Sequence, residues 1–120
     1  MTTENLDVAI LGGGMAGSLL ARQLVRRLPS HRIAVFEKKQ EHSFTVGESM
    51  VEIASNYFVR RLGLGSYLYD RHYPKNGLRF FFDSSEKDAP LPEMSELGSA
   101  SLPFHPAFQV DRSRLETDLL

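Results

Sequence analysis

The chain has 120 residues, 42% of them hydrophobic, and a formal charge of −1 from 14 basic and 15 acidic side chains. This balance argues against a nucleic-acid partner, and the absence of cysteine excludes disulfides, thiolate nucleophiles and cysteine-ligated metals. The four histidines lack metal-ligand spacing, and no signal peptide or apolar run of roughly 20 residues occurs, so we expect no metal site, no membrane contact and a cytoplasmic protein.

The first predicted elements are a strand over residues 6–11, a glycine turn and a helix. The strand segment is short, apolar and rich in β-branched residues, and apolar residues recur at helical spacing after the turn. Between them, Gly12, Gly14 and Gly17 have the G-x-G-x-x-G spacing of a dinucleotide fingerprint. Gly12 permits the tight turn, Gly14 lets a pyrophosphate approach, and Gly17 lets the helix lie close to the sheet. The alternative is a merely flexible turn.

A second strand is predicted over residues 32–36 and is followed by Glu37. This acid lies 20 residues after Gly17, where a carboxylate is expected to accept hydrogen bonds from a ribose. Such a charge-assisted pair contributes roughly 1.5–3 kcal/mol, although Glu37 could also be a surface carboxylate. We expect the backbone of Gly12, Gly14, Met15, Ala16 and Gly17 to hold the pyrophosphate at the helix N-terminus.

The remaining elements are predicted in chain order: a polar loop over 38–47, a helix over 48–62 closed by Gly63 and Gly65, a short helix over 67–72, a turn over 74–77, a strand over 78–82, a surface loop over 83–105, an extended segment over 108–110, and a helix capped by Asp111.

The predicted elements include too few parallel strands for a complete dinucleotide fold, and the last residues resemble the interior of a helix. We therefore expect an incomplete N-terminal piece of a larger protein.

Three segments together resemble the flavin-dependent halogenases, a branch of the FAD monooxygenases with the aromatic-hydroxylase type of fold. The first is the glycine run with Glu37. The second, residues 44–49, reads F-T-V-G-E-S and is similar to the V-G-E-S/A stretch of these halogenases. The third, residues 108–115, reads F-Q-V-D-R-S-R-L and resembles their V-D-R-x-x-L/F segment. The resemblance covers nearly the whole chain.

The resemblance implies an α/β fold class, with a Rossmann-like FAD-binding β-α-β unit and the start of a further α+β region. It implies that residues 1–74 begin the FAD-binding domain, 75–107 start a substrate-domain excursion, and 108–120 return to the FAD-binding domain. The cofactor would be FAD, reduced by a separate flavin reductase. The implied cofactor contacts beyond the glycine turn and Glu37 are Lys38, Val46, Gly47, Glu48, Ser49, Gln109 and Arg112.

Several of these residues have a plainer interpretation. Gly47 followed by Glu48 and Ser49 could simply start a helix, with an acid favoured in the first turn. Arg112 could be a surface arginine at a helix start, and Gln109 is the weaker of the two candidates for a contact with the flavin ribityl or phosphates. Lys38 beside Glu37 does not distinguish FAD from NAD, because both present the same adenosine ribose.

By the same resemblance, Lys75 stands where halogenases place their catalytic lysine. In that family, reduced flavin, oxygen and a halide ion give hypohalous acid, and the lysine delivers its halogen to an electron-rich aromatic ring. A lysine ammonium suits this role because it donates three hydrogen bonds from one point charge. The substrate would be a phenol, pyrrole or indole, either free or tethered to a carrier protein. The plainer alternative is a solvated lysine in a surface turn.

Two further functional classes stay open at this point. One is a flavin-dependent hydroxylase or reductase of the same superfamily, in which Lys75 is incidental. The other is a non-catalytic dinucleotide-binding module that uses NAD. A W-x-W-x-I-P segment distinguishes halogenases but would lie beyond Leu120, and the chain contains no tryptophan. We therefore do not expect these residues alone to form a complete enzyme.

Overall fold

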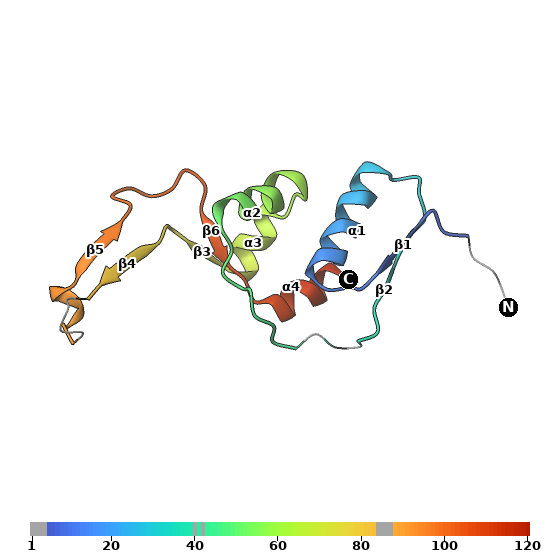
Figure 1. Cartoon of the computed structure of the whole chain (residues 1–120). Coiled ribbons are helices and arrows are strands. Elements are labelled where there is room, and N and C mark those ends of the chain that lie inside the picture. Colours follow the sequence, from blue (N-terminus) through green and yellow to red (C-terminus); the bar gives the residue numbers. More distant parts are fainter. Residues whose placement is uncertain (1–4, 40, 42, 84–87) are drawn as a thin grey trace.

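The computed structural model describes residues 5–39, 41, 43–83 and 88–120. The molecule is elongated, with principal extents of 70 × 29 × 23 Å. Figure 1 shows three parts in a row: a strand–helix–strand unit, a central group of helices around a short sheet, and a two-stranded arm.

The strand–helix–strand unit has the order expected from the glycine turn. Strand β1 (Val8–Leu11) leads through the turn into helix α1 (Met15–Arg27), and β2 (Ile33–Phe36) returns beside β1. The two strands are parallel, with Val8 paired to Ile33 and Leu11 to Phe36. Parallel neighbours require a crossover connection, which α1 supplies. The carboxyl ends of both strands and the start of α1 therefore lie at one edge.

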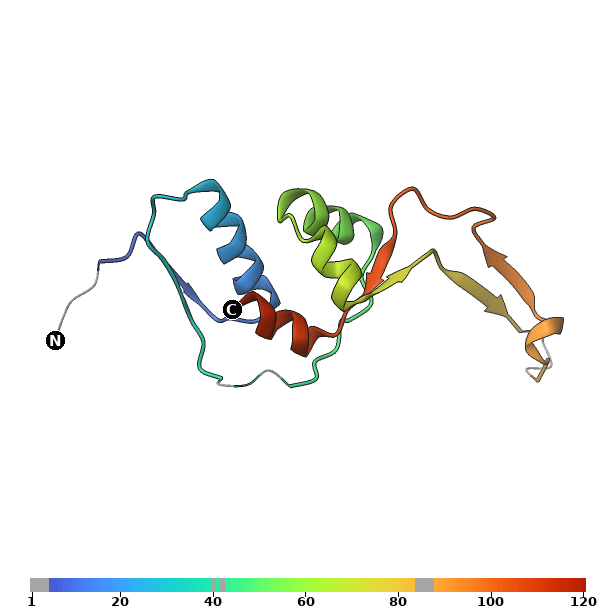
Figure 2. The same cartoon turned by 180° about the vertical axis from the view of Figure 1, so that it is seen from behind.

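The central part contains the hydrophobic core. Its elements are α2 (Glu52–Asn56), the π-helical turn η1 (Tyr57–Arg61), α3 (Gly65–Arg71), and the antiparallel pair β3 (Tyr73–Lys75) and β6 (Ala107–Gln109). Helix α4 (Arg112–Leu119) follows β6 and lies beside the start of α1 in both views (Figures 1 and 2). The buried apolar side chains of the core come from α1, η1, α3, β6, α4 and the segments that connect them: Leu19, Met50, Phe58, Leu62, Leu64, Leu68, Phe108, Val110 and Leu115.

The arm is a pair of antiparallel strands, β4 (Arg79–Phe82) and β5 (Ser95–Gly98), with a short 3₁₀ turn η2 (Leu91–Glu93) before β5. It points away from the other two parts in both views (Figures 1 and 2). The expectation of a loop over 83–105 is therefore wrong for residues 95–98; its residues 84–87 lie outside the described part. The S-E-L-G segment has weak strand character of its own, and its pairing with β4 decides its conformation.

Two other expectations are corrected by backbone pairing. The predicted helix over 48–62 begins only at Glu52, because the preceding residues bind the segment around β6: Met50 N–H donates to Phe108 O at 2.9 Å, and Val110 N–H donates to Glu48 O at 2.9 Å. The predicted turn over 74–77 is partly wrong, because Pro74 and Lys75 belong to β3. Gly77, with φ at +86°, then redirects the chain into β4.

The predictions of a turn at Gly63 and of a cap at Asp111 are confirmed. Gly63 follows the second helical segment with φ at +66°, although Gly65 opens α3 rather than closing the preceding helix. The carboxylate of Asp111 accepts a hydrogen bond from Arg114 N–H at 3.1 Å and caps α4. Among the described residues, no helix combines the length and apolarity needed to cross a membrane.

Candidate functional site

The glycines of the turn are needed for two different physical reasons. Gly12 has φ at +103°, a region that side chains disfavour, and a Cβ on Gly17 would lie 1.8 Å from the Gly12 carbonyl oxygen. The fold itself therefore requires these two glycines. Gly14 differs, because its φ of −64° suits any residue and a Cβ there would meet no atom within 4 Å. Its missing side chain leaves open space in front of the α1 N-terminus, which is where a diphosphate would approach.

A cleft of about 420 Å³ lies at this edge of the β1–β2 pair. It is lined by Leu11, Gly12, Gly14, Phe36, Glu37, Lys38, Lys39 and Glu116. One carboxylate oxygen of Glu37 accepts from Gly13 N–H at 2.5 Å, and the other accepts from Lys39 N–H at 2.9 Å. Four of the residues expected to contact the cofactor (Gly12, Gly14, Glu37 and Lys38) thus share one cleft, and the amides at the start of α1 suit an anion there.

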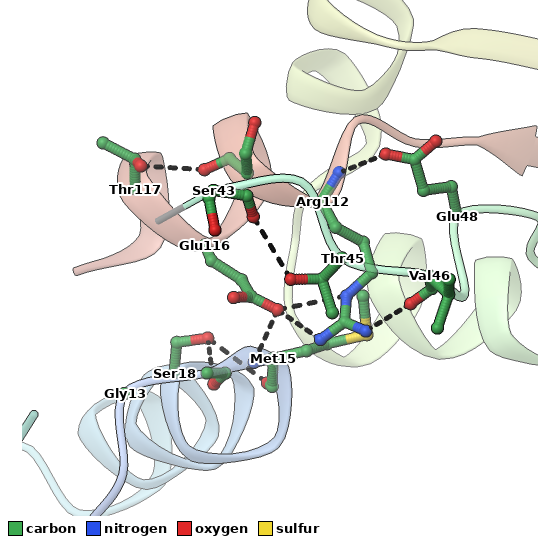
Figure 3. A network of polar contacts seen from close by, with 12 residues as sticks. Gly13, Met15, Ser18, Ser43, Thr45, Val46, Glu48, Arg112, Glu116 and Thr117 are labelled. Atoms are coloured by element: carbon green, nitrogen blue, oxygen red, sulfur yellow. Dashed lines mark hydrogen bonds and ion pairs between the residues drawn. The ribbon is translucent and has the colours of Figure 1, made fainter. Parts of the chain in front are cut away.

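Glu116 was not anticipated and connects the start of α1 with α4. Figure 3 shows its carboxylate between the two helices. Its Oε1 accepts from Met15 N–H at 3.2 Å and from Arg112 Nε at 3.1 Å, and it also pairs with Arg112 Nη2. A carboxylate is favoured at the positive end of a helix dipole. The i,i+4 spacing of Arg112 and Glu116 was the available sequence signal, but the contact with Met15 had none.

Arg112 holds the 46–48 segment against α4. Its Nη1 donates to the Val46 carbonyl at 2.6 Å, and its backbone N–H donates to Glu48 Oε1 at 3.3 Å (Figure 3). Its contacts with Val46 and Glu116 use three of the five N–H donors of a guanidinium. The remaining two could point toward a phosphate or a ribityl hydroxyl. Gly47, with φ at +95°, allows the segment to turn beside this side chain.

A second group of expected site residues meets around β6. Ser49 forms an antiparallel bridge with Gln109, and Gln109 is also the partner of Tyr73 in β3. Two residues further along β3, Lys75 pairs with Ala107, and its Nζ donates a hydrogen bond to Ser49 Oγ at 2.5 Å. Three segments that the resemblance selected separately are therefore adjacent in space.

A buried histidine supports the turn between β6 and α4. His72 is 5% exposed; its Nδ1 accepts from Asp111 N–H at 3.2 Å, and its Nε2 lies 3.3 Å from the Tyr67 hydroxyl, which donates to Asp118 at 2.9 Å. Since Nδ1 accepts, the proton of the neutral ring is on Nε2. Burial lowers the pKa of His72 and, together with the hydrogen bond to Asp118, raises the pKa of Tyr67.

The carboxyl group that caps α4 also titrates outside its ordinary range. Hydrogen bonds from the Ser113 hydroxyl and the Arg114 backbone N–H lower the pKa of Asp111, because they stabilise its ionised form. Arg112 therefore lies at the start of a helix that is fixed in position by the Asp111 cap and by His72.

The expected site residues form two groups with one connection. The glycine turn, Glu37 and Lys38 lie at the cleft, whereas Ser49, Lys75 and Gln109 lie around β6. The chain of contacts from Val46 through Arg112 and Glu116 to Met15 joins the groups. The first group presents the glycine turn and the start of α1 at the cleft, and the second presents a lysine beside a hydroxyl.

Comparison with known proteins identifies the class that this fold and site define. The family model described as tryptophan halogenase matches residues 7–81, more than half of the chain. The chain belongs to this family of flavin-dependent halogenases. The flavin-dependent halogenase chlA of Dictyostelium discoideum is 35% identical over 126 residues, which cover 98% of this chain and 21% of that protein.

Solved structures agree with this assignment. The myxobacterial chondrochloren halogenase CndH, an FAD-dependent halogenase, is 28% identical with a TM-score of 0.73, over 98% of this chain and 26% of that one. The flavin-dependent brominase Bmp2 is 25% identical with a TM-score of 0.68, over 95% and 26%. The chain therefore spans about a fifth to a quarter of the length of these relatives. The resemblance inferred from the motifs is confirmed, and the comparisons do not favour a hydroxylase, a reductase or an NAD-binding module.

Proposed function

We propose that the whole protein is an FAD-dependent halogenase of electron-rich aromatic compounds and that this chain supplies its FAD-binding face and its halogen-transferring lysine. The single observation that carries the proposal is the contact between Lys75 and the 46–49 segment, because it brings the expected lysine and the expected flavin-binding stretch into one place. Family membership gives this juxtaposition its chemical meaning.

The residues present fit an FAD molecule. Its diphosphate would lie at the glycine turn and the first turn of α1 (Gly12, Gly14, Met15, Ala16 and Gly17), in the space that the missing Cβ of Gly14 leaves, and would replace the Glu116 carboxylate as the acceptor for Met15 N–H. Glu37 would accept hydrogen bonds from the adenosine ribose, with Lys38 beside it. The β1–α1–β2 unit would thus have a Rossmann-like role.

The flavin end would lie along residues 46–49, with Arg112 and Gln109 beside it. The Arg112 guanidinium keeps donors beyond its contacts with Val46 and Glu116, which suits the ribityl chain or a phosphate. When bound in its reduced form, FAD would supply the two electrons of the reaction, and a separate reductase would replenish them.

The overall reaction balances with a halide as co-substrate. Dioxygen, halide and one proton accept two electrons and two further protons, giving hypohalous acid and one water molecule. Lys75 would then either donate a hydrogen bond to the hypohalous acid or, as a neutral amine, exchange one hydrogen for the halogen with loss of water. The halogen finally replaces a ring proton. An ammonium suits the first route because of its three donors.

The substrate class and the domain limits belong to this proposal. A phenol, pyrrole or indole, free or tethered to a carrier protein, provides the electron-rich carbon that an electrophilic halogen needs. Residues 1–74 and 108–120 would contribute to the FAD-binding domain, and 75–107 would begin a substrate-domain excursion. Its two ends are joined by the pairing of Lys75 with Ala107.

The test is Lys75→Ala in the full-length protein. We expect halogenated product to fall about 100-fold or more, the size of effect typical for a group that transfers a proton or its equivalent, while reduced FAD is still reoxidised. Product is measured by mass spectrometry and flavin reoxidation by absorbance. Arg27→Ala, which removes an exposed cation at the end of α1, is the control. Normal chlorination or bromination by the Lys75 variant would refute the role of this lysine.

A further inference from the structure

We propose that the hydroxyl of Ser49 is a positioning group for the amine of Lys75. The inference rests on the proposed function, since it requires Lys75 to transfer the halogen. The family resemblance assigns Ser49 only a place along the flavin. The geometry adds a direct contact, because Lys75 Nζ donates to Ser49 Oγ at 2.5 Å.

The backbone holds both residues in register for this contact. Ser49 is the bridge partner of Gln109, and Lys75 is the partner of Ala107 in the same strand, β6. Directly paired residues share a face of a sheet, as do residues two apart in one strand. Lys75, Ala107, Gln109 and Ser49 therefore lie on one face, with β6 between the two partners of the hydrogen bond.

On the 48–50 segment and around β6, the opposite face is anchored in the core. Met50, Phe108 and Val110 alternate with the site residues and are 7%, 0% and 1% exposed. Slipping the 48–50 segment or β6 by one residue would expose Met50, Phe108 and Val110 and bury Ser49 and Gln109, so their register is strongly specified. Ala107, on the site face, is itself buried, with 1% exposure. Lysine has a flexible four-carbon stem, and a partner fixed in this way restricts where its amine can lie.

A hydroxyl is chemically suited to this task. It offers one donor and two acceptor positions, whereas an ammonium has three donors and no acceptor. Ser49 can accept one N–H from the charged form and leave two for hypohalous acid. After the amine loses a proton, the hydroxyl can rotate and donate to the nitrogen lone pair. Ser49 can thus hold Nζ in either protonation state, on the segment expected to follow the flavin.

The decisive comparison is Ser49→Val against Ser49→Thr in the full-length protein. Valine and threonine have nearly the same shape and both suit extended backbone, so they differ here by one hydroxyl. We expect the valine variant to give about tenfold less halogenated product per flavin reoxidised, the effect of losing one charge-assisted hydrogen bond, with hypohalous acid released to a scavenger. The threonine variant should restore most of the yield that the valine variant loses, and FAD affinity, measured by fluorescence quenching, should be the same in the two variants.

A second readout is independent of turnover. Acetic anhydride labelling of the flavin-free protein, followed by mass spectrometry, measures the reactivity of the Lys75 amine, with Lys39 as internal reference. Because the amine must leave its hydroxyl partner to react, Ser49→Val should raise the labelling rate several-fold and Ser49→Thr should not. Equal labelling and equal yield in the two variants would overturn the proposal, as would a loss of FAD affinity in the valine variant with unchanged Lys75 labelling.

Lys75→Ala, assayed in parallel, distinguishes a failure of the positioning role of Ser49 from a failure of the proposed role of Lys75. If it loses halogenation while Ser49→Val behaves as wild type, the positioning role of Ser49 is refuted and the proposed function stands. If Lys75→Ala still halogenates normally, the role of the lysine is refuted and the inference about Ser49 falls with it.

Discussion

At the scale of single residues, His72 shows that the site depends on side chains that take no part in the proposed reaction. It is buried behind the start of α4, faces Tyr67, and receives the N–H of Asp111, the residue before Arg112. Losing a buried hydrogen-bond partner typically costs about 1–3 kcal/mol. The direction of Arg112 is therefore set partly by a histidine in α3's C-terminal cap.

We predict that stability falls as the pH drops below the ordinary histidine value. The pKa of His72 is lowered from 6.5 in the folded state by burial, although Asp111 and Asp118 oppose this effect and Arg114 adds to it. At pH values between the lowered pKa and 6.5, the histidine is protonated in the unfolded chain and neutral in the folded chain. The free energy of unfolding therefore rises with pH in this interval and levels off above about pH 6.5. The slope is at most about 1.4 kcal/mol per pH unit.

The check is the thermal unfolding midpoint of the full-length protein at several pH values between 5 and 8. His72→Asn keeps an acceptor for Asp111 N–H but removes the titration, and should flatten the curve in this range. His105→Asn is the control, because His105 is only partly buried. An unchanged slope in His72→Asn would show that another group is responsible.

At the scale of elements, the junction of β1, the glycine turn and α1 combines a folding requirement with a ligand requirement. Gly17 is packed against the Gly12 carbonyl, whereas Gly14 faces open space. The same motif thus contains two glycines that the fold needs, Gly12 and Gly17, and one, Gly14, that an anion would need. Glu116 adds an acceptor for Met15 N–H at this junction from a residue 101 positions away.

This difference predicts opposite phenotypes for two alanine variants. Gly17→Ala should lower the free energy of unfolding by about 1–3 kcal/mol or more, because the helix must move away from the turn. Gly14→Ala should lower the free energy of unfolding by less than about 1 kcal/mol, because Gly14 is the N-cap of α1 and alanine is a poorer N-cap. It should nevertheless weaken FAD binding about tenfold or more, because its methyl group occupies the approach to the amides. Denaturant titration and flavin fluorescence distinguish the two. Equal FAD affinity in Gly14→Ala and wild type would argue against a diphosphate at this turn.

The whole molecule is far from compact. Its radius of gyration is 19.6 Å, whereas a globular domain of this length has about 13–14 Å. The β4–β5 arm points away from the other two parts (Figures 1 and 2), and Phe80, Phe81, Phe82 and Leu97 on it are 45–62% exposed. An apolar surface of this kind marks a contact site or an association risk.

We therefore predict that residues 1–120, prepared alone, bind the hydrophobic dye ANS through the arm. Replacing Phe80 and Phe82, which share one face of β4, by serine should reduce the dye fluorescence markedly. Val25→Ser, which removes an exposed apolar residue of α1, should change it little. Equal fluorescence of the double variant and the parent chain would mean that the dye binds elsewhere.

The amino-acid sequence by itself determined the features whose causes are local. Glycine spacing, apolar periodicity and capping chemistry act within a few residues, so the strand–turn–helix–strand order, the position of Glu37 and the Asp111 cap could be predicted. Tertiary structure alone decided that Ser49 receives the hydrogen bond of Lys75, 26 residues away, and that Glu116 reaches Met15. It also decided that residues 48–50 are extended and that 95–98 form a strand. These outcomes depend on which distant backbone segments pair, and pairing is set by the burial of a shared core rather than by the preferences of either segment.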